Sequence, residues 1–143
     1  LQCLRDMRKR LAVLKPQESR WDFKNGPGGI QDIELMAQAI GLYKKCYKTS
    51  IKEQIVSGVK DSNFVAQDLK YLIQSYTLLT ERRILHRLMC VTDGRISEIG
   101  TGGKLRLEKI TNLDPSDVFD EVILRIRERC ADIISNVLTR SER

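Results

Sequence analysis

The stretch that decides the fold is residues 21–34, which read WDFKNGPGGIQDIE. Three of the nine glycines in the chain and one of its three prolines fall within four consecutive positions, 26–29. Glycine adopts backbone angles that are closed to other residues, so the stretch predicts a sharp turn with a positive φ at Gly28 or Gly29. From Ile30 onward, apolar side chains recur at helical spacing. We therefore expect a glycine elbow that opens directly into a helix.

The helix decides how the two carboxylates after the elbow are oriented. On a strand, Asp32 and Glu34 would share a face and could hold Mg²⁺ together. On a helix, at about 100° per residue, they stand about 200° apart. The sequence therefore predicts no shared metal ion. We expect one carboxylate to cap or brace the elbow and the other to meet a basic side chain.

A phosphate site is the alternative interpretation of the elbow. Glycines ahead of a helix N-terminus present backbone N–H groups to an anion, and Lys24 lies close by in the sequence. The pattern is not G-x-x-x-x-G-K-[ST], however, and no β-α-β unit surrounds it. The carboxylates of Asp32 and Glu34 would also repel a phosphate in the first helical turn. We prefer the structural turn.

Outside the elbow, helical periodicity dominates. The stripe of Leu4, Met7, Leu11 and Leu14 predicts a first helix that ends before Pro16. Further helices are expected from Ile30 to about Tyr47, over 51–57, from about Ser62 to Cys90, and from Asp114 onward. Residues 21–24 alternate in polarity and are expected to be extended. These elements predict an all-α fold, a bundle of four main helices plus a short one.

Local signals mark several helix ends. Ser50 and Glu53 have the spacing of a capping box, and Gly58 is expected just past the end of the short helix. Asp114 followed by Pro115 predicts the start of the last helix. Its stripe repeats at spacings of 3 and 4: Phe119, Val122, Ile126, Cys130, Ile133 and Val137.

Length and composition indicate one globular domain, and we expect residues 1–143 to be a single helical domain cut from a longer protein. No apolar run approaches the ~18 residues that cross a bilayer, so no membrane association is expected. The four cysteines are spaced singly, which predicts buried free thiols in a reducing cytoplasm rather than a zinc site. The net charge is +6, and residues 1–50 hold ten Lys/Arg against five Asp/Glu. That excess favours an anionic ligand, an acidic neighbour or simply a solvated face.

No residue pattern indicates catalysis by this chain alone. There is no G-x-S-x-G, and no cysteine has a histidine partner evident in the sequence. His86, the only histidine, lies among arginines in the long helix and is expected to be a packing or surface residue. With 6% aromatic residues and no reading motif, nucleic acid is not an expected partner.

The segment 24–38, KNGPGGIQDIELMAQ, resembles the signature D-x-K-x-x-x-G-G-[ILM]-x-[DE]-I-E-[FL]-x-x-Q. That signature belongs to the helical domain that follows each nucleotidyltransferase domain in bacterial glutamine synthetase adenylyltransferases, and a related form occurs in the PII uridylyltransferases. The arginine-rich segment 78–88, LLTERRILHRL, is similar to a second landmark of the family, and the opening MRKRL fits the helix before the signature. The matching positions are Asp22, Lys24, Gly28, Gly29, Ile30, Asp32, Ile33, Glu34 and Gln38.

The resemblance implies a cytoplasmic nitrogen-control enzyme that transfers AMP from ATP, with Mg²⁺, to a tyrosine of glutamine synthetase. The family's catalytic site needs a Gly-Ser turn and D-x-D carboxylates, and this chain contains neither. The chain would therefore bind no ATP, Mg²⁺ or other cofactor alone and would be inactive without an upstream nucleotidyltransferase domain. The elbow residues Lys24, Gly28, Gly29, Asp32, Glu34 and Gln38 would face that domain or the nucleotide.

A second hypothesis is a regulatory or protein-binding module without a direct role at the active site. In that case Arg82, Arg83 and Arg87 on the long helix would form the surface that receives glutamine synthetase, the PII signalling protein or an effector. The Trp-Asp-x-Lys start of the signature favours the C-terminal half of the adenylyltransferase, which adds AMP.

Overall fold

Five helices lie within the residues that the structure describes. The computed structural model describes residues 2–17, 22–46, 48–59, 61, 64–89, 102, 105, 109 and 118–140. The helices are α1 (Gln2–Leu14), α2 (Ile30–Tyr43), α3 (Ile51–Gly58), α4 (Ala66–Met89) and α6 (Val118–Arg140). No strand occurs among these residues, so the predicted all-α fold with four main helices and a short one is confirmed.

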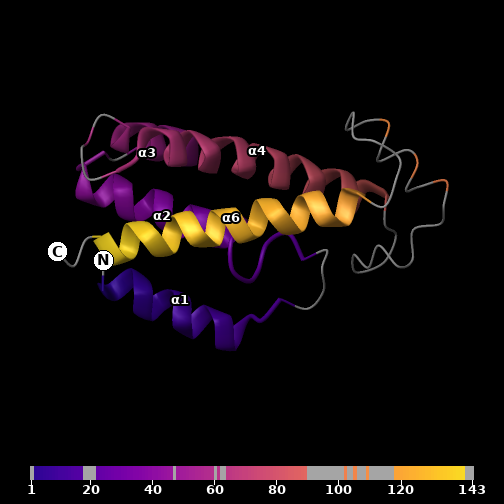
Figure 1. The fold of residues 1–143 in the computed structure, drawn as a ribbon, viewed down its shortest axis with the longest axis horizontal. Coiled ribbons are helices and arrows are strands. Elements are labelled where there is room, and N and C mark those ends of the chain that lie inside the picture. The colour runs from indigo at the N-terminus through magenta and orange to yellow at the C-terminus, as the bar shows by residue number, and fades with distance from the viewer. Residues whose placement is uncertain are drawn as a thin grey trace.

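The two longest helices, α4 and α6, run antiparallel along the long axis of the molecule (Figure 1). The α2 and α3 helices pack at the end where α4 begins, and α1 packs against α2. The beginning of the chain and the end of α6 are neighbours, because Nη2 of Arg5 donates a hydrogen bond to the carbonyl oxygen of Leu138 at 3.0 Å. The elbow therefore lies in a bundle whose first and last helices are tied together.

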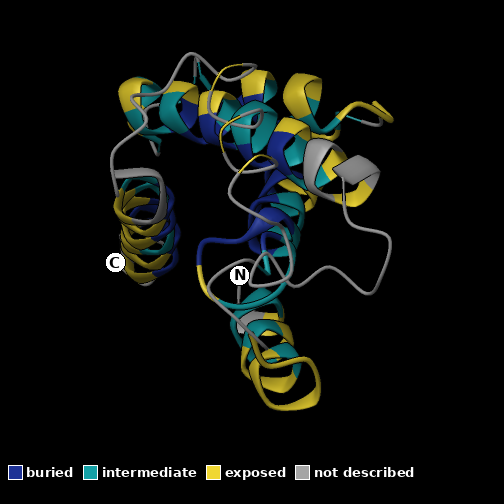
Figure 2. Ribbon diagram, turned by 90° about the vertical axis from the view of Figure 1, so that its right-hand side faces the viewer, coloured by how far each residue is buried: buried dark blue, intermediate teal, exposed yellow. Residues whose placement is uncertain are grey.

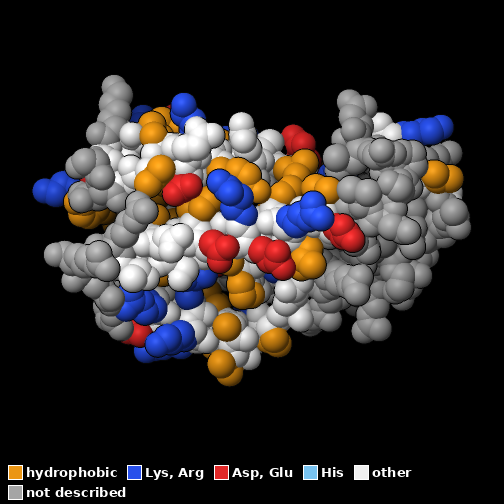
Figure 3. All heavy atoms as spheres, in the orientation of Figure 1, with side chains coloured by type: hydrophobic (Ala, Val, Ile, Leu, Met, Phe, Trp, Pro, Cys, Tyr) orange, Lys and Arg blue, Asp and Glu red, His pale blue; other side chains and the backbone are white. Residues whose placement is uncertain are grey.

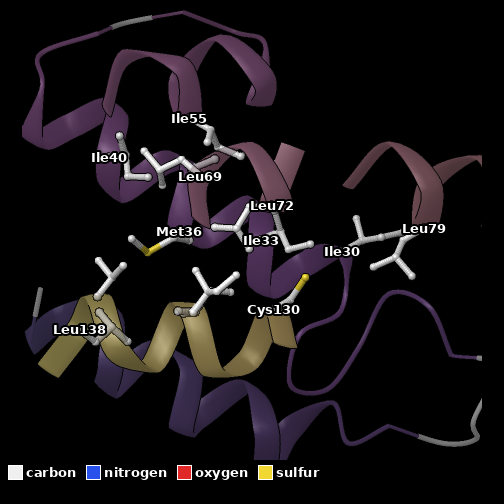
Figure 4. Packing of buried hydrophobic residues seen from close by; sticks show 14 of the residues in the cluster. Ile30, Ile33, Met36, Ile40, Ile55, Leu69, Leu72, Leu79, Cys130 and Leu138 are labelled. Atoms are coloured by element: carbon white, nitrogen blue, oxygen red, sulfur yellow. The ribbon is translucent and has the colours of Figure 1, made fainter. Parts of the chain in front are cut away.

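The core lies where α2, α3, α4 and α6 meet (Figures 2 and 4). Met36 of α2 lies between the two sides of this core, with α4 above it and Leu138 of α6 below (Figure 4). Helical spacing of three and four residues brings these side chains onto single faces. The fully or almost fully buried residues include Ile33, Met36, Ile40, Ile55, Leu69, Leu72, Leu79, Ile123, Cys130 and Ile134.

The first helix departs from its predicted stripe. Leu4 packs against the core, but Met7 is 44% exposed and Leu14 is 76% exposed. The reason is that α1 meets the bundle along one edge and is held there by polar side chains, so half of its apolar stripe faces outward (Figure 2). Helical periodicity predicted the element correctly but not the depth of its burial.

The ends of α2 and α3 also differ in part from expectation. The α2 helix ends at Tyr43, before the predicted Tyr47, because Lys45 adopts a left-handed φ of 52° and the amide of Cys46 turns back to the Gly41 carbonyl. The side chain of Ser50 caps α3 by accepting from the Glu53 amide, as predicted.

Gly58 is not the residue beyond the end of α3. It is the last residue of that helix, and its φ is not positive. A Cβ at this position would lie 2.9 Å from Cγ2 of Ile40 and 3.1 Å from Cδ1 of Leu69. Glycine suits this position because side chains of α2 and α4 pack closely against it.

The structure also differs from expectation at the start of α4, before the elbow and at one cysteine. The α4 helix begins at Ala66, later than expected, and residues 23–26 form bends, so an extended piece over 21–24 is not found among the described residues. Of the thiols, Cys130 is buried but Cys3 is exposed, so uniform burial of the cysteines was a wrong expectation. The predicted start at Asp114–Pro115, Cys90, and the side chains of His86 and Phe119 lie outside the described part.

Within the described residues, no helix combines the length and the apolar character that a bilayer crossing requires.

The buried thiol of Cys130 makes stability sensitive to alkaline pH. Burial raises the pKa of this thiol above its usual value of 9.0, and a hydrogen bond with Ser75 opposes that shift. The native state therefore keeps the proton at a pH where the unfolded chain has lost it, so the free energy of unfolding falls as the pH rises above about 9. In urea titrations between pH 8 and 10, Cys130→Ala should show a shallower decline than the wild type. Cys3→Ala, at an exposed thiol, should keep the wild-type slope, and equal slopes for all three proteins would contradict this assignment.

Candidate functional site

The elbow is a hydrogen-bonded turn rather than an open loop. The Asp22 carboxylate accepts from the amides of Lys24 and Asn25 at 3.1 and 3.0 Å, which starts the turn. Gly26 and Gly28 have φ values of 83° and 67°, so both lie in the left-handed region that favours glycine. The prediction of a positive φ at Gly28 or Gly29 is confirmed at Gly28, and the positive φ at Gly26 was not foreseen.

Successive amides of the elbow find acceptors within it. Gly29 donates to the Gly26 carbonyl at 3.2 Å, Ile30 to Phe23 at 2.9 Å, and Gln31 to Lys24 at 3.1 Å. Gly29, with an extended backbone, is the residue that precedes α2. The amides at the start of this helix are therefore satisfied by protein carbonyls, which leaves less capacity for an anion at this helix end.

The Arg127 side chain clamps the elbow from α6. Arg127 is 3% exposed, and its guanidinium donates to three backbone carbonyls: Asp22, Asn25 (2.5 Å from Nη2) and Pro27 (3.4 Å from Nε and Nη2). Burial lowers the pKa of Arg127, and the nearby carboxylates of Asp22 and Asp32 oppose that shift. The planar fork of arginine suits a site where several acceptors must be bound at once.

The two central glycines let the elbow backbone touch its neighbours. A Cβ on Gly28 would overlap the carbonyl group of Arg127, so the elbow and α6 meet backbone to backbone. A Cβ on Gly29 would lie 2.7 Å from the carbonyl oxygen of Lys24. Two adjacent positions therefore exclude any side chain, which explains why this turn contains Gly28-Gly29.

Asp32 ties the elbow to the first helix. Its carboxylate accepts hydrogen bonds from Nε and Nη2 of Arg8 at 2.5 and 2.8 Å and from the Gly28 amide at 2.9 Å. The residue is 7% exposed, so both interactions lie in a largely desolvated position. Asp32 thus braces the turn, which is the role expected for one of the two carboxylates.

Glu34 points elsewhere. Its Oε1 accepts from the hydroxyl of Tyr76 on α4 at 3.4 Å, whereas Asp32 meets α1 and the elbow. Burial, followed by the nearby Glu34 charge, raises the pKa of the Tyr76 hydroxyl. The two carboxylates therefore contact different elements, and the partner of Glu34 is a tyrosine rather than the basic side chain expected.

The remaining predicted site residues are not all gathered at one place. Lys24 is half-buried within the elbow, but Gln38 is exposed two turns further along α2. Arg82 is only 2% exposed, so it cannot belong to an exposed partner surface with Arg83 and Arg87; burial lowers its pKa to about 10. Arg82 lies in the register of the buried residues Leu72, Ser75 and Leu79, and the helix therefore directs it inward.

The Arg8–Asp32 pair should show strong energetic coupling. Replacing Asp32 by asparagine removes a charge-assisted acceptor, so we expect it to cost about 1.5–3 kcal/mol of unfolding free energy. A double-mutant cycle of Asp32→Asn with Arg8→Gln should give a coupling of about 1–3 kcal/mol in urea titrations. The control cycle is Arg125 with Glu121, whose side chains are 77% and 67% exposed, and it should give under about 0.5 kcal/mol. Equal coupling in the two cycles would contradict the bracing role.

The buried charges at this site hold the elbow in position. Across the described residues, no three His, Cys, Asp or Glu side chains are grouped to hold a metal ion. The buried charges of Arg127 and Asp32 are used on elbow carbonyls, on an elbow amide and on Arg8. The arrangement fixes the elbow as a rigid corner between α1, α2 and α6.

Arg127 is the residue that sequence reasoning missed. It stands in the charged segment 125–129, RIRER, whose composition is typical of a solvated face, and its partners are 100 to 105 positions away. The available signal was its register: Arg127 follows Ile123 by four residues and precedes Cys130 by three, so it shares their buried stripe.

Comparison with known proteins gives one match. The model of the family described as GlnD PII-uridylyltransferase matches residues 5–134, a range that includes α1, the elbow and Arg127. No curated protein and no solved structure matches the chain significantly. A match over this range covers nearly all of the 143 residues. The chain, an all-helical unit related to nucleotidyltransferases, therefore belongs to the GlnD PII-uridylyltransferase family.

Proposed function

We propose that this chain is a single helical accessory domain that follows the catalytic domain of a nucleotidyltransferase in nitrogen regulation. The full enzyme would work in the cytoplasm and transfer AMP from ATP, with Mg²⁺, to a tyrosine of glutamine synthetase. The family match supports a nucleotidyltransferase parent. The resemblance of residues 22–38 to the adenylyltransferase signature supports this choice of nucleotide and acceptor.

The accessory role is supported mainly by the contacts of the signature residues, which bind other helices and the elbow within this chain. Gly28 touches α6, Asp32 binds Arg8 and the Gly28 amide, and Glu34 meets Tyr76. Each of these residues shapes the corner between helices. Phosphoryl-type transfer needs metal-binding carboxylates and a bound triphosphate, which a neighbouring catalytic domain would supply.

The family description favours a second acceptor, because it names uridylylation of PII. The two choices differ in nucleotide and in target protein, so one assay separates them. The chain is incubated with Mg²⁺, radiolabelled ATP or UTP, and glutamine synthetase or PII, first alone and then joined to an upstream nucleotidyltransferase domain. We expect label in glutamine synthetase from ATP in the joined protein only.

Two results would overturn the proposal. Transfer by the chain alone would contradict an accessory role, and label in PII from UTP would replace the proposed acceptor.

Gly28→Ala in the joined protein should lower kcat, because the corner that contacts the catalytic domain is displaced.

A protein-binding module is the other candidate, and the first helix favours it. Met7, Val13 and Leu14 are 44%, 80% and 76% exposed, and orange side chains follow the lower edge of the molecule over α1 (Figure 3). Exposed apolar side chains of this kind occur at protein interfaces. Titration of isotope-labelled chain with glutamine synthetase and with PII tests this function; shifts confined to α1 would support it, and an unchanged spectrum with both proteins would exclude it.

A further inference from the structure

A cleft of about 270 Å³ separates α1 from the elbow. Its wall on one side is α1, and its other wall is formed by Gly26 and Pro27 of the elbow and by Gln31 and Leu35 of α2. The volume is close to the lower limit of ordinary small-molecule sites, so it fits a compact ligand rather than a folded partner.

Positive charge dominates this cleft. Its lining holds four cationic side chains, Arg5, Arg8, Lys9 and Lys15, against one carboxylate, Asp32. Arg8 already neutralises Asp32 through a bidentate pair. The negative charge of Asp32, which would repel an anion at the elbow, is therefore neutralised by Arg8.

Lys9 and Lys15 line the cleft and can bind a ligand there. Both are exposed, and within the described part of the chain neither ammonium group takes part in a hydrogen bond or ion pair. Their Cα atoms are separated by about 9 Å along the axis at 1.5 Å per residue.

We propose that this α1–elbow cleft binds an oligophosphate, an anion with two or more linked phosphate groups. Ammonium groups bind phosphate oxygens as point charges, and two lysines that line one cleft about 9 Å apart along the helix axis fit linked phosphates better than one orthophosphate. The cleft walls exclude part of the solvent, which strengthens these ion pairs relative to pairs on an open surface. The site is distinct from the amides at the start of α2, which are bonded within the elbow.

The binding site does not depend on the proposed function. Binding is measured on this chain alone, whereas nucleotidyl transfer requires the joined catalytic domain, so either result can fail while the other holds. Free polyphosphate and the phosphate tail of a nucleotide both present linked, negatively charged phosphate groups, and the experiment distinguishes them.

The test is calorimetric titration of the 143-residue chain with tripolyphosphate, ATP, UTP and orthophosphate at about 0.01 M and about 0.15 M ionic strength. The variant is Lys9→Gln/Lys15→Gln, which removes two exposed charges without touching the Arg8–Asp32 pair. The matched control, Lys52→Gln/Lys70→Gln, removes two exposed lysines on α3 and α4 and changes the net charge equally.

We expect tripolyphosphate to bind more tightly than orthophosphate, and more tightly at low than at high ionic strength. The cleft variant should weaken binding by about tenfold or more, while the control stays within about twofold. Equal affinity for tripolyphosphate and nucleotides indicates a free oligophosphate, and tighter nucleotide binding indicates a nucleotide tail; both support the site. No binding to the wild type, an equal loss in the control variant, or orthophosphate binding as tightly as tripolyphosphate would each overturn it.

Discussion

Replacing Arg127 by methionine is expected to lower the free energy of unfolding by about 3–5 kcal/mol. The variant keeps the aliphatic stem but leaves the carbonyls of Asp22, Asn25 and Pro27 without their buried donor. An unpaired buried polar group costs about 1–3 kcal/mol, and three are affected here. Urea denaturation followed by circular dichroism measures the change.

The matched control for this prediction is Arg125→Met on the same helix. Arg125 is exposed and pairs with the exposed Glu121 at 3.4 Å, so its loss should cost under about 0.5 kcal/mol. Arg127→Lys should lie between the two variants, because an ammonium keeps the charge but lacks the fork that reaches several carbonyls. A cost below about 1 kcal/mol for Arg127→Met would contradict the clamp.

Gly28→Ala is expected to destabilise the chain by about 2–5 kcal/mol. The φ of 67° strains any residue with a Cβ, at about 1–3 kcal/mol. The added methyl group also overlaps the Arg127 carbonyl, which is backbone and cannot rotate away, and overpacking of this kind costs about 1–3 kcal/mol. The measurement is again urea denaturation, with α6 and the elbow expected to separate in the native state.

Gly102→Ala provides the control for the same chemical change. No atom of the described residues lies within 4 Å of the Cβ that would be added there, so its effect should remain within about 0.5 kcal/mol. Comparable costs at the two glycines would show that close contact with α6 is not what requires glycine at position 28.

The helices and the elbow were predictable because their signals are local. Apolar spacing from Ile30 onward gave α2, a cap at Ser50 gave α3, and the run of glycines gave the turn. Each of these signals depends on neighbours within about four residues, which sequence patterns record directly. The divergence of Asp32 and Glu34 followed from the same helical geometry.

The clamp was not predictable in the same way, because it joins residues about a hundred positions apart. Arg127 resembles its charged neighbours in sequence, and only the buried register of Ile123 and Cys130 distinguishes it. The same limit applies to Met7, whose helical spacing does not reveal that α1 packs along one edge. Long-range packing decides both outcomes.

This arrangement gives the signature a physical meaning. The glycines allow backbone contact with α6, Arg127 fixes the carbonyls on that side, and Asp32 fixes the amide of Gly28 toward α1. Pre-organised corners of this kind position neighbouring groups at little entropic cost. A rigid elbow is therefore suited to hold a catalytic domain in register, which is the role proposed for this chain.

Amide hydrogen exchange at positions 28–31 tests the rigid elbow most directly. All four amides donate hydrogen bonds to protein acceptors, so the account predicts protection comparable to that of Met36 in the core of α2. In Arg127→Met the same amides should exchange faster relative to Met36, because the clamp that holds their loop is lost. Exchange in the wild type as rapid as in an open loop would contradict the claim that α1, α6 and the elbow form one locked corner.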